Sequence, residues 1–234
     1  MPNELVLILV LFSVYTLVIL WYRLFGVKGL MCFSVLVTIA ANIEVMIVIE
    51  AFGMEQTLGN ILYAATFLVT DILSETEGKK TSQKAVNIGI AASATFVFLS
   101  QTWLWYTPSA SDSVFPAVQA LFSGIPRFII VSLAVYAITQ KFDVWAYHKW
   151  WDWTTEKFGD RTRFLWLRNN GSTLISQFFN TVLFTVGAFA GTYNFSTLLS
   201  IVASSYIIFI VTSLLDTPFV YWARKIHQKR SSCG

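Results

Sequence analysis

Long apolar stretches fill most of this 234-residue chain and constrain its fold more than any other feature. Residues 5–25, 30–52 and 86–106 are each long enough, at about 1.5 Å per residue, to cross the ~30 Å hydrocarbon layer of a bilayer. Charged residues make up only 12% of the chain, against about 25% in soluble domains. The sequence therefore predicts an all-α membrane protein, a compact bundle with no room left for a soluble domain.

The lengths of the apolar runs predict about seven transmembrane helices. We expect them at residues 5–25, 29–52, 57–73, 85–106, 115–140, 171–190 and 195–223. The first, third and fifth connections and the C-terminal tail contain Lys and Arg, whereas the second, fourth and sixth connections contain neither. Because basic loops stay in the cytoplasm, this alternation predicts an external N-terminus and a cytoplasmic C-terminus. The net charge of +3 follows from these loops and does not indicate nucleic-acid binding.

The fifth connection is rich in tryptophan, with four of these residues between positions 145 and 153. Lysines and acidic residues alternate with them, and this mixture is typical of a helix that lies along the membrane surface. We therefore expect an interfacial helix near residues 142–158. Its role is either to anchor the last helices or to gate a pathway.

Polar side chains inside the predicted spans are the strongest candidates for function. Asn42, Glu44, Arg127, Gln177 and Asn180 lie within the second, fifth and sixth spans. A charge at the bilayer centre costs about 2.5–3.5 kcal/mol on insertion scales, so these groups should face the bundle interior. We expect them to form a substrate site near the midplane. An alternative is that Glu44 and Arg127 simply pair and lock two helices together.

A second polar set lies nearer the predicted cytoplasmic face. We expect a structural or gating cluster of Asp71, Glu75, Arg168, Asn170 and Asp216, which positions helices rather than contacts a ligand. Alternatively, Asp71 and Asp216 are interfacial residues bonded to lysines or helix ends.

No motif of a soluble enzyme is present: the chain has no P-loop, no HExxH and no glycine-rich nucleotide turn. Both histidines, His148 and His227, lie in segments that flank the spans. We therefore expect no enzymatic activity, no metal and no cofactor. Without an ATP site, transport would draw energy from a gradient, from trapping of the product or from a separate ATPase.

Several blocks resemble one transporter family. The motif at 67–75, FLVTDILSE, is followed by Gly78-Lys79-Lys80 and resembles the signature of the queuosine precursor transporter family, also called the vitamin uptake transporter family. Three further blocks agree in order and spacing: Pro126-Arg127 and the residues to 143, 166–177 with WLRNN, and Tyr206 with Asp216-Thr-Pro218. Together they cover about residues 40–225.

The chain also departs from the pattern of that family. Glu77 stands where an aromatic residue is common, Asn180 where the residue is usually acidic, and Phe209 where a lysine is frequent. The N-terminal span resembles an addition to a six-helix core. The resemblance thus divides the chain into an extra helix (1–28), a core (29–225) and a cytoplasmic tail (226–234).

The resemblance implies import of a precursor of the tRNA nucleoside queuosine, namely 7-cyano-7-deazaguanine, its aminomethyl relative or queuine. Carboxylate and amide groups can pair with a guanine-like edge, and aromatic side chains such as Tyr63 and Phe67 can stack on its ring. The implied place is the cytoplasmic (inner) membrane of a prokaryote, with the lipid bilayer and a deazapurine as partners.

Two other classes of function remain open. The chain could be the substrate-binding subunit of a transporter for a vitamin-like solute, with a separate ATPase complex as its partner. An intramembrane enzyme or a structural scaffold is a weaker alternative, because no convergent nucleophile and base are evident. Whether the chain forms a homo-oligomer is also left open by the sequence.

Overall fold

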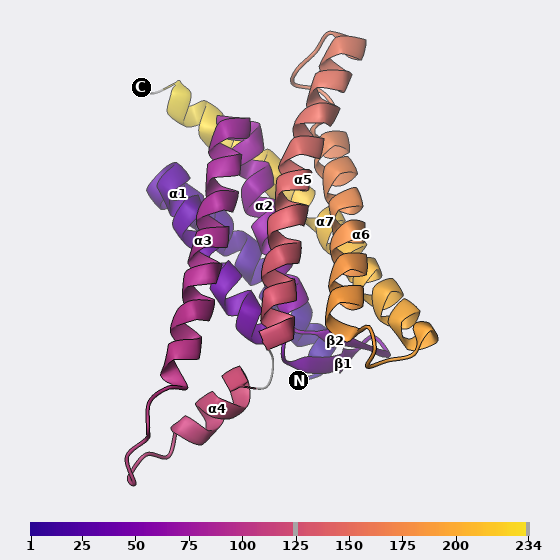
Figure 1. Cartoon of the computed structure of the whole chain (residues 1–234). Helices are drawn as coiled ribbons and strands as arrows, with labels where there is room; N and C mark the ends of the chain where they lie inside the picture. The colour runs from indigo at the N-terminus through magenta and orange to yellow at the C-terminus, as the bar shows by residue number, and fades with distance from the viewer. Residues whose placement is uncertain (124–125, 233–234) are drawn as a thin grey trace.

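The computed structural model of the protein describes residues 1–123 and 126–232, without the side chains of residues 55, 126–129 and 231. It is a helical bundle with one small hairpin (Figure 1). In chain order the elements are α1 (Asn3–Glu44), β1 (Val48–Ala51), β2 (Met54–Thr57), α2 (Gly59–Glu77), α3 (Lys79–Trp103), α4 (Phe115–Ser123), α5 (Pro126–Phe158), α6 (Leu165–Phe189) and α7 (Phe195–Ser231).

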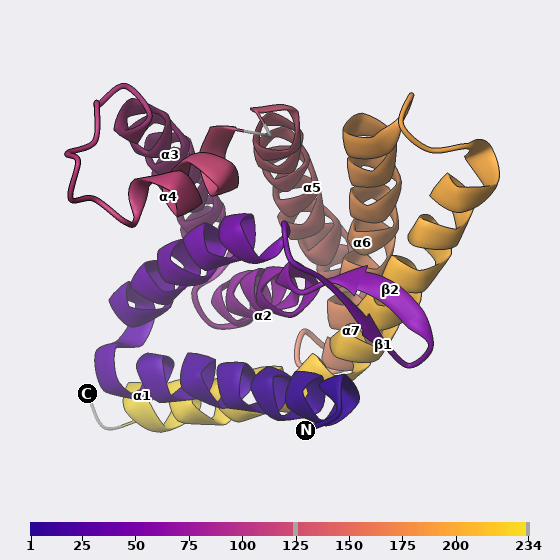
Figure 2. The same ribbon diagram turned by 90° about the horizontal axis from the view of Figure 1, so that it is seen from below.

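Helix α1 folds back on itself at Gly26, whose backbone has φ 64° and ψ −145°. Glycine adopts this conformation without the steric penalty that a Cβ would add. The two halves of α1 therefore lie at an angle to each other, as Figure 2 shows from below. They take the places of the first two predicted spans. The C-terminal part of α7 closes over this bend, where Arg230 Nη2 donates to the carbonyl of Arg23 at 2.6 Å.

The second predicted span, 29–52, is too long: α1 ends at Glu44 and an antiparallel hairpin follows. Val48 pairs with Thr57 and Ala51 with Met54. Phe52 and Gly53 form the turn with φ values of 55° and 70°. Two consecutive positive φ angles are the requirement of a type I′ hairpin turn, and Gly53 makes this turn accessible. The apolar residues after Glu44 are therefore strand residues rather than the end of a span.

The prediction around the fifth span is also wrong in detail. Residues Phe115–Ser123 form a short helix, α4, and Pro126 is the first residue of α5. Proline is well suited to the first turn of a helix, where its missing N–H is not needed. The segment 142–158 is not a separate interfacial helix, because α5 runs unbroken to Phe158. No glycine or proline interrupts α5, and buried Asp143 and Tyr147 fix it against its neighbours.

Helix α2 is the central helix of the bundle. Every residue from Ala64 to Ser74 is buried, and α2 packs against α1, α3, α5 and α7. Figure 2 shows it enclosed by these helices. A helix that faces protein on all sides can carry polar residues such as Thr70 and Asp71, provided that they find partners. In the described part of the chain, α1, α3, α6 and α7 are long and apolar enough to cross a membrane.

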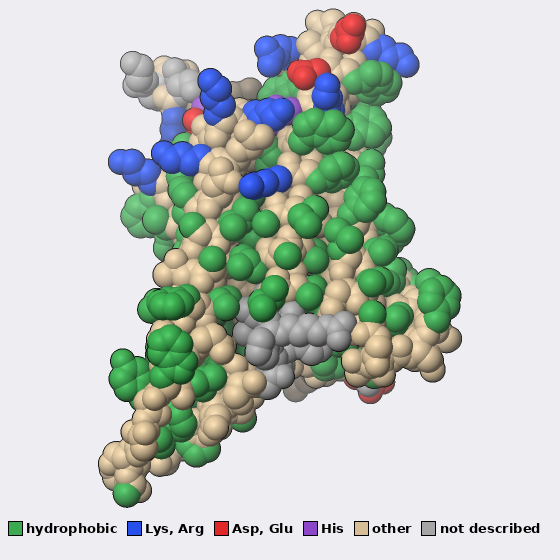
Figure 3. Space-filling model, viewed as in Figure 1, with side chains coloured by type: hydrophobic (Ala, Val, Ile, Leu, Met, Phe, Trp, Pro, Cys, Tyr) green, Lys and Arg blue, Asp and Glu red, His purple; other side chains and the backbone are tan. Residues whose placement is uncertain are grey.

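The molecule has two chemically different ends. Large apolar side chains cover its flank, and the Lys and Arg side chains visible in Figure 3 gather at the end where α2, α5 and α7 finish. The N-terminus and the hairpin lie at the opposite end (Figure 1). The fold is thus an all-α multi-pass membrane bundle. We call the line from its hairpin end to its basic end the polar axis, because the buried polar residues described below lie along it.

Candidate substrate-binding site

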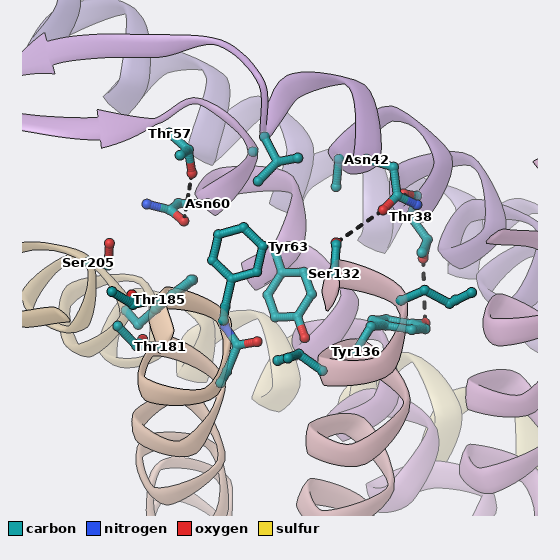
Figure 4. A pocket seen from close by; sticks show the side chains of 18 of the residues that line it. Thr38, Asn42, Thr57, Asn60, Tyr63, Ser132, Tyr136, Thr181, Thr185 and Ser205 are labelled. Carbon is teal, nitrogen blue, oxygen red and sulfur yellow. Dashed lines mark hydrogen bonds between the residues drawn. The ribbon is translucent and has the colours of Figure 1, made fainter. Parts of the chain in front are cut away.

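A pocket lies at the hairpin end of the bundle, between α1, α2, α5, α6 and α7 (Figure 4). Its empty volume, which includes open solvent at the mouth, is about 740 Å³. Most of its polar groups are uncharged amides and hydroxyls. Those labelled in Figure 4 are Thr38, Asn42, Thr57, Asn60, Tyr63, Ser132, Tyr136, Thr181, Thr185 and Ser205.

Aromatic rings form the centre of the pocket. The ring of Tyr63 lies 6.0 Å from that of Tyr136 and 6.2 Å from that of Phe209, between centroids. The Tyr63 hydroxyl is paired with Thr139 Oγ1 at 3.0 Å, which holds the ring in place. These rings come from α2, α5 and α7 and offer faces on which a flat ligand can stack.

On one side of Tyr63, Asn42 joins three helices. Its Nδ2 donates to the carbonyl of Thr38 at 3.0 Å and to Ser93 Oγ on α3 at 3.4 Å, and its Oδ1 accepts from Ser132 Oγ on α5 at 3.2 Å. The side chain is 8% exposed and lines the pocket. These bonds fix the orientation of the amide but are long, so a ligand could replace one of them.

On the other side of Tyr63, α6 contributes Thr181 and Thr185 (Figure 4), and Asn180 of the same helix also lines the pocket. The Asn180 Nδ2 donates to Gln177 Oε1 at 3.4 Å, a bond near the geometric limit. Gln177 is 1% exposed and lies behind the pocket surface rather than on it. Asn180 can therefore turn its amide toward a ligand, because only this one long hydrogen bond is lost.

The structure brings three of the seven predicted binding residues, Asn42, Tyr63 and Asn180, to the pocket. Gln177 lies one turn from Asn180, and the buried ring of Phe67 lies 5.5 Å from that of Tyr63, so both support the wall. Glu44 is not among the residues that line the pocket. Because α1 ends at this residue, Glu44 lies beside the hairpin and outside the pocket lining.

The side chain of Arg127 lies outside the described residues, so its pairing with Glu44 or a ligand stays a prediction. Sequence reasoning did not select several lining residues on α1, α5 and α6. A helical-spacing signal was available for two of them, since Thr181 and Thr185 follow Gln177 at successive intervals of four. Short hydroxyl residues are common in helices, which makes such a signal weak on its own.

Deeper in the bundle a layer of amide and hydroxyl groups closes the pocket. Gln140 Nε2 donates to Thr66 Oγ1 at 2.6 Å, and Thr70 Oγ1 donates to Gln140 Oε1 at 3.2 Å. All three side chains are buried. This layer joins α2 to α5 and separates the pocket from the charged residues beyond it.

Beyond that layer lies the predicted structural or gating set. Arg168 donates to both carboxylate oxygens of Glu75 at 2.7–3.0 Å, and Tyr147 donates to Glu75 Oε2 at 2.8 Å. The side chains of Arg168 and Glu75 are 0% and 3% exposed. The guanidinium carbon also lies 4.3 Å from the centroid of the Trp151 ring. This is a buried bidentate ion pair with nearly all its donors engaged.

The other three members of the predicted set, Asp71, Asn170 and Asp216, take part in hydrogen bonds that join α6 to α2 and α7. Asn169 Nδ2 donates to Asp216 Oδ1 at 2.8 Å, Asn170 Nδ2 donates to Thr217 Oγ1 at 2.7 Å, and Thr173 Oγ1 donates to Asp71 Oδ2 at 3.1 Å. The five predicted residues thus lie on one side of the pocket, within the same polar axis. In the described part of the chain, no three His, Cys, Asp or Glu side chains are grouped closely enough to hold a metal ion.

Comparison with known proteins gives two matches. The model of a family described as "Putative vitamin uptake transporter" matches residues 57–223. A protein of Bacillus subtilis (strain 168) named "Probable queuosine precursor transporter" is 36% identical over 220 residues, which cover 93% of this chain and 94% of that protein. No solved structure matches the chain. The family match contains α2, α5, α6 and most of α7, and therefore most of the pocket.

Proposed function

Because the chain belongs to the vitamin uptake transporter family, we propose that it imports a queuosine precursor, a 7-deazaguanine base, into the cytoplasm. The name of the Bacillus relative suggests the class of substrate, and the pocket supports it. We further propose that the protein performs no chemistry on this substrate and acts as a carrier in the cytoplasmic membrane.

The observation that carries this proposal is the combination of an aromatic wall with neutral amides from two helices. Asn42 of α1 and Asn180 of α6 both line the pocket, and Tyr63, Tyr136 and Phe209 form its aromatic surface. A 7-deazaguanine offers flat faces, an N–H and amino edge, and a carbonyl. Amide groups both donate and accept hydrogen bonds, so they can pair with either edge of the ring. A charged side chain beside an uncharged ring edge would instead have no opposite charge to pair with.

We propose seven membrane crossings, with the two halves of α1 counted separately and the N-terminus outside. The basic end, where α2, α5 and α7 finish, would then face the cytoplasm. The pocket at the hairpin end would open toward the exterior, and the Glu75–Arg168 pair would close the inner side. This is the arrangement expected of an importer that is waiting for substrate. Cysteine labelling that found position 80 accessible from outside would reverse this orientation.

The function can be tested with purified protein and a panel of bases. We expect 7-cyano-7-deazaguanine, its aminomethyl relative or queuine to bind more tightly than adenine, because adenine lacks the guanine-like N–H and carbonyl edge. Calorimetry or thermal-shift titration measures this order. Equal binding of adenine and the 7-deazaguanines, or no binding of any of them, would contradict the proposal.

A carrier and a binding subunit of an ATPase complex bind substrate alike, so transport must separate them. We expect liposomes that contain only this chain to take up labelled 7-deazaguanine. Uptake that required a separate ATPase complex would assign the chain to the second class.

A further inference from the structure

Three aspartates lie in the interior of the bundle, on three different helices: Asp71 on α2, Asp143 on α5 and Asp216 on α7. They are 0%, 0% and 1% exposed. Each accepts one hydrogen bond from α6, namely Asp71 from Thr173 at 3.1 Å, Asp143 from Ser176 at 2.8 Å and Asp216 from Asn169 at 2.8 Å. The resulting site is built by four helices and deeply buried.

None of the three carboxyl groups forms an ion pair with a described residue. The nearby cation, Arg168, is committed to Glu75 by its two-oxygen contact. The lysines of α3 form no ion pair with a described acidic residue either. The titratable and charged groups around the aspartates are Tyr15 on α1, Tyr63 and Glu75 on α2, Tyr147 on α5 and Arg168 on α6. Three buried anions without a cation would be very unfavourable.

The geometry of Asp71 and Asp143 gives the same conclusion independently. Asp71 Oδ1 and Asp143 Oδ2 are buried, and no described residue donates a hydrogen bond to them. Their other oxygens accept from Thr173 and Ser176, which lie one turn apart on α6, so the two carboxyl groups face the same part of that helix. A buried carboxylate that lacks donors on one oxygen and forms no ion pair is stabilised when it carries a proton. The pair resembles in principle the carboxyl dyads that share one proton because two adjacent charges repel.

We propose that Asp71 and Asp143 form a proton-binding site through which inward transport of the substrate is coupled to inward movement of a proton. This inference rests on the proposed import of a 7-deazaguanine and adds its source of energy. One proton would bind to the pair from the external water and leave to the cytoplasmic water in each cycle. With a neutral base as cargo, each cycle would carry one positive charge inward.

Short chains of neighbouring residues connect Asp71 and Asp143 to both the pocket and the Glu75–Arg168 ion pair. On the pocket side, Asp143 is one turn from Gln140 and Thr139, and Thr139 is bonded to Tyr63 of the pocket. Ser176, the donor to Asp143, precedes Gln177, which accepts from Asn180. On the other side, Asp71 is one turn from Glu75 in the ion pair with Arg168. Movement of α5 or α6 on substrate binding would therefore change the contacts that decide whether the proton stays.

The experiment uses liposomes that contain the full chain, a pH-sensitive dye inside and valinomycin with potassium to compensate charge. We expect added 7-cyano-7-deazaguanine to acidify the interior, and an inward proton gradient to increase accumulation of labelled substrate at least tenfold. Asp143→Asn should lose both effects but keep exchange of labelled for unlabelled substrate within about twofold. Asparagine can still accept from Ser176 and has an N–H donor in place of the second oxygen, so it imitates the protonated state. Asp152→Asn, an exposed position on the same helix, is the matched control.

Infrared difference spectroscopy provides a readout that does not need substrate. We expect a protonated carboxyl band at neutral pH that Asp143→Asn or, if that variant fails to fold, Asp71→Asn removes. Absence of the band, uptake that is driven by sodium, or uptake without proton movement would overturn the coupling while leaving import intact. If the band is present but no 7-deazaguanine is transported, the proposed function fails and the coupling fails with it.

Discussion

The two ends of the polar axis use hydrogen bonds in opposite ways. In the pocket, Asn42 and Asn180 make bonds of 3.0–3.4 Å between neutral groups, and part of the surface is open. At the other end, Glu75 and Arg168 make charged bonds of 2.7–3.0 Å with almost no exposure. The comparison suggests that ligand binding needs polar groups that can exchange partners, whereas closure of the basic end needs groups whose hydrogen bonds are all made within the protein.

The largest expected effect comes from breaking the closed end. Arg168→Met removes the partner of a buried carboxylate, and losing one member of a buried ion pair typically costs about 3–5 kcal/mol. We expect a clear drop in the thermal unfolding temperature of the purified protein. Arg224→Met is the control, because Arg224 is more exposed and approaches Glu75 only at 3.5 Å. If Arg168→Met unfolds at the parent temperature, the pair does not stabilise the bundle.

A second prediction concerns the packing that supports the pocket. A Cβ at Gly89 of α3 would fall on the hydroxyl of Tyr136, so Gly89→Ala must displace that ring. Overpacking of this kind costs about 1–3 kcal/mol. We expect lower thermal stability and weaker binding of 7-deazaguanine together. Tyr136→Phe combined with Gly89→Ala should recover part of the stability, because it removes the nearest atom. No recovery would mean that the contact with the Tyr136 hydroxyl is not what destabilises Gly89→Ala.

At the pocket, we expect substitutions to change the affinity for the ligand more than the thermal stability, which is the reverse of the effect expected at the Glu75–Arg168 pair. Asn180→Ala removes an amide that lines the pocket and has one long bond, so we expect binding to weaken by about 1–3 kcal/mol, roughly 5- to 150-fold in Kd. Thermal stability should stay near that of the parent. Gln177→Ala, behind the wall, should weaken binding less, and Asn87→Ala on the exposed face of α3 should not change it. Equal binding by Asn180→Ala and the parent would place the pocket elsewhere.

The apolar pattern predicted an all-α membrane bundle of long helices, because burial in lipid constrains every residue of a span. It did not predict where the chain changes from helix to hairpin. Residues 45–52 are as apolar as a span, and only the Phe52–Gly53 turn and the pairing with residues 54–57 distinguish them. Likewise, the tryptophans near 150 have the composition of a surface helix, yet contacts such as that of Trp151 with Arg168 make them part of α5.

The site could be predicted only in part for a related reason. Asn42 and Asn180 stand out because an amide within an apolar run demands a partner. Threonines and serines such as Thr181 do not, since a hydroxyl can bond to the carbonyl four residues earlier, as Thr181 does to Gln177 at 2.8 Å. Depth in the bundle also depends on where each helix ends. That dependence explains why Glu44, the last residue of α1, lies outside the pocket lining.

The smallest expected effect therefore concerns Glu44 itself. In the structure this carboxyl lies at the end of α1, partly exposed and outside the pocket lining. We expect Glu44→Gln to leave the Kd for 7-deazaguanine within about twofold and the unfolding free energy within about 0.5 kcal/mol, as for most surface changes. Asn42→Ala, two residues earlier and within the pocket, is the contrasting variant and should weaken binding. If Glu44→Gln abolished binding instead, the Glu44 carboxylate would contact the ligand. The description of the pocket as a site of neutral amides would then be wrong.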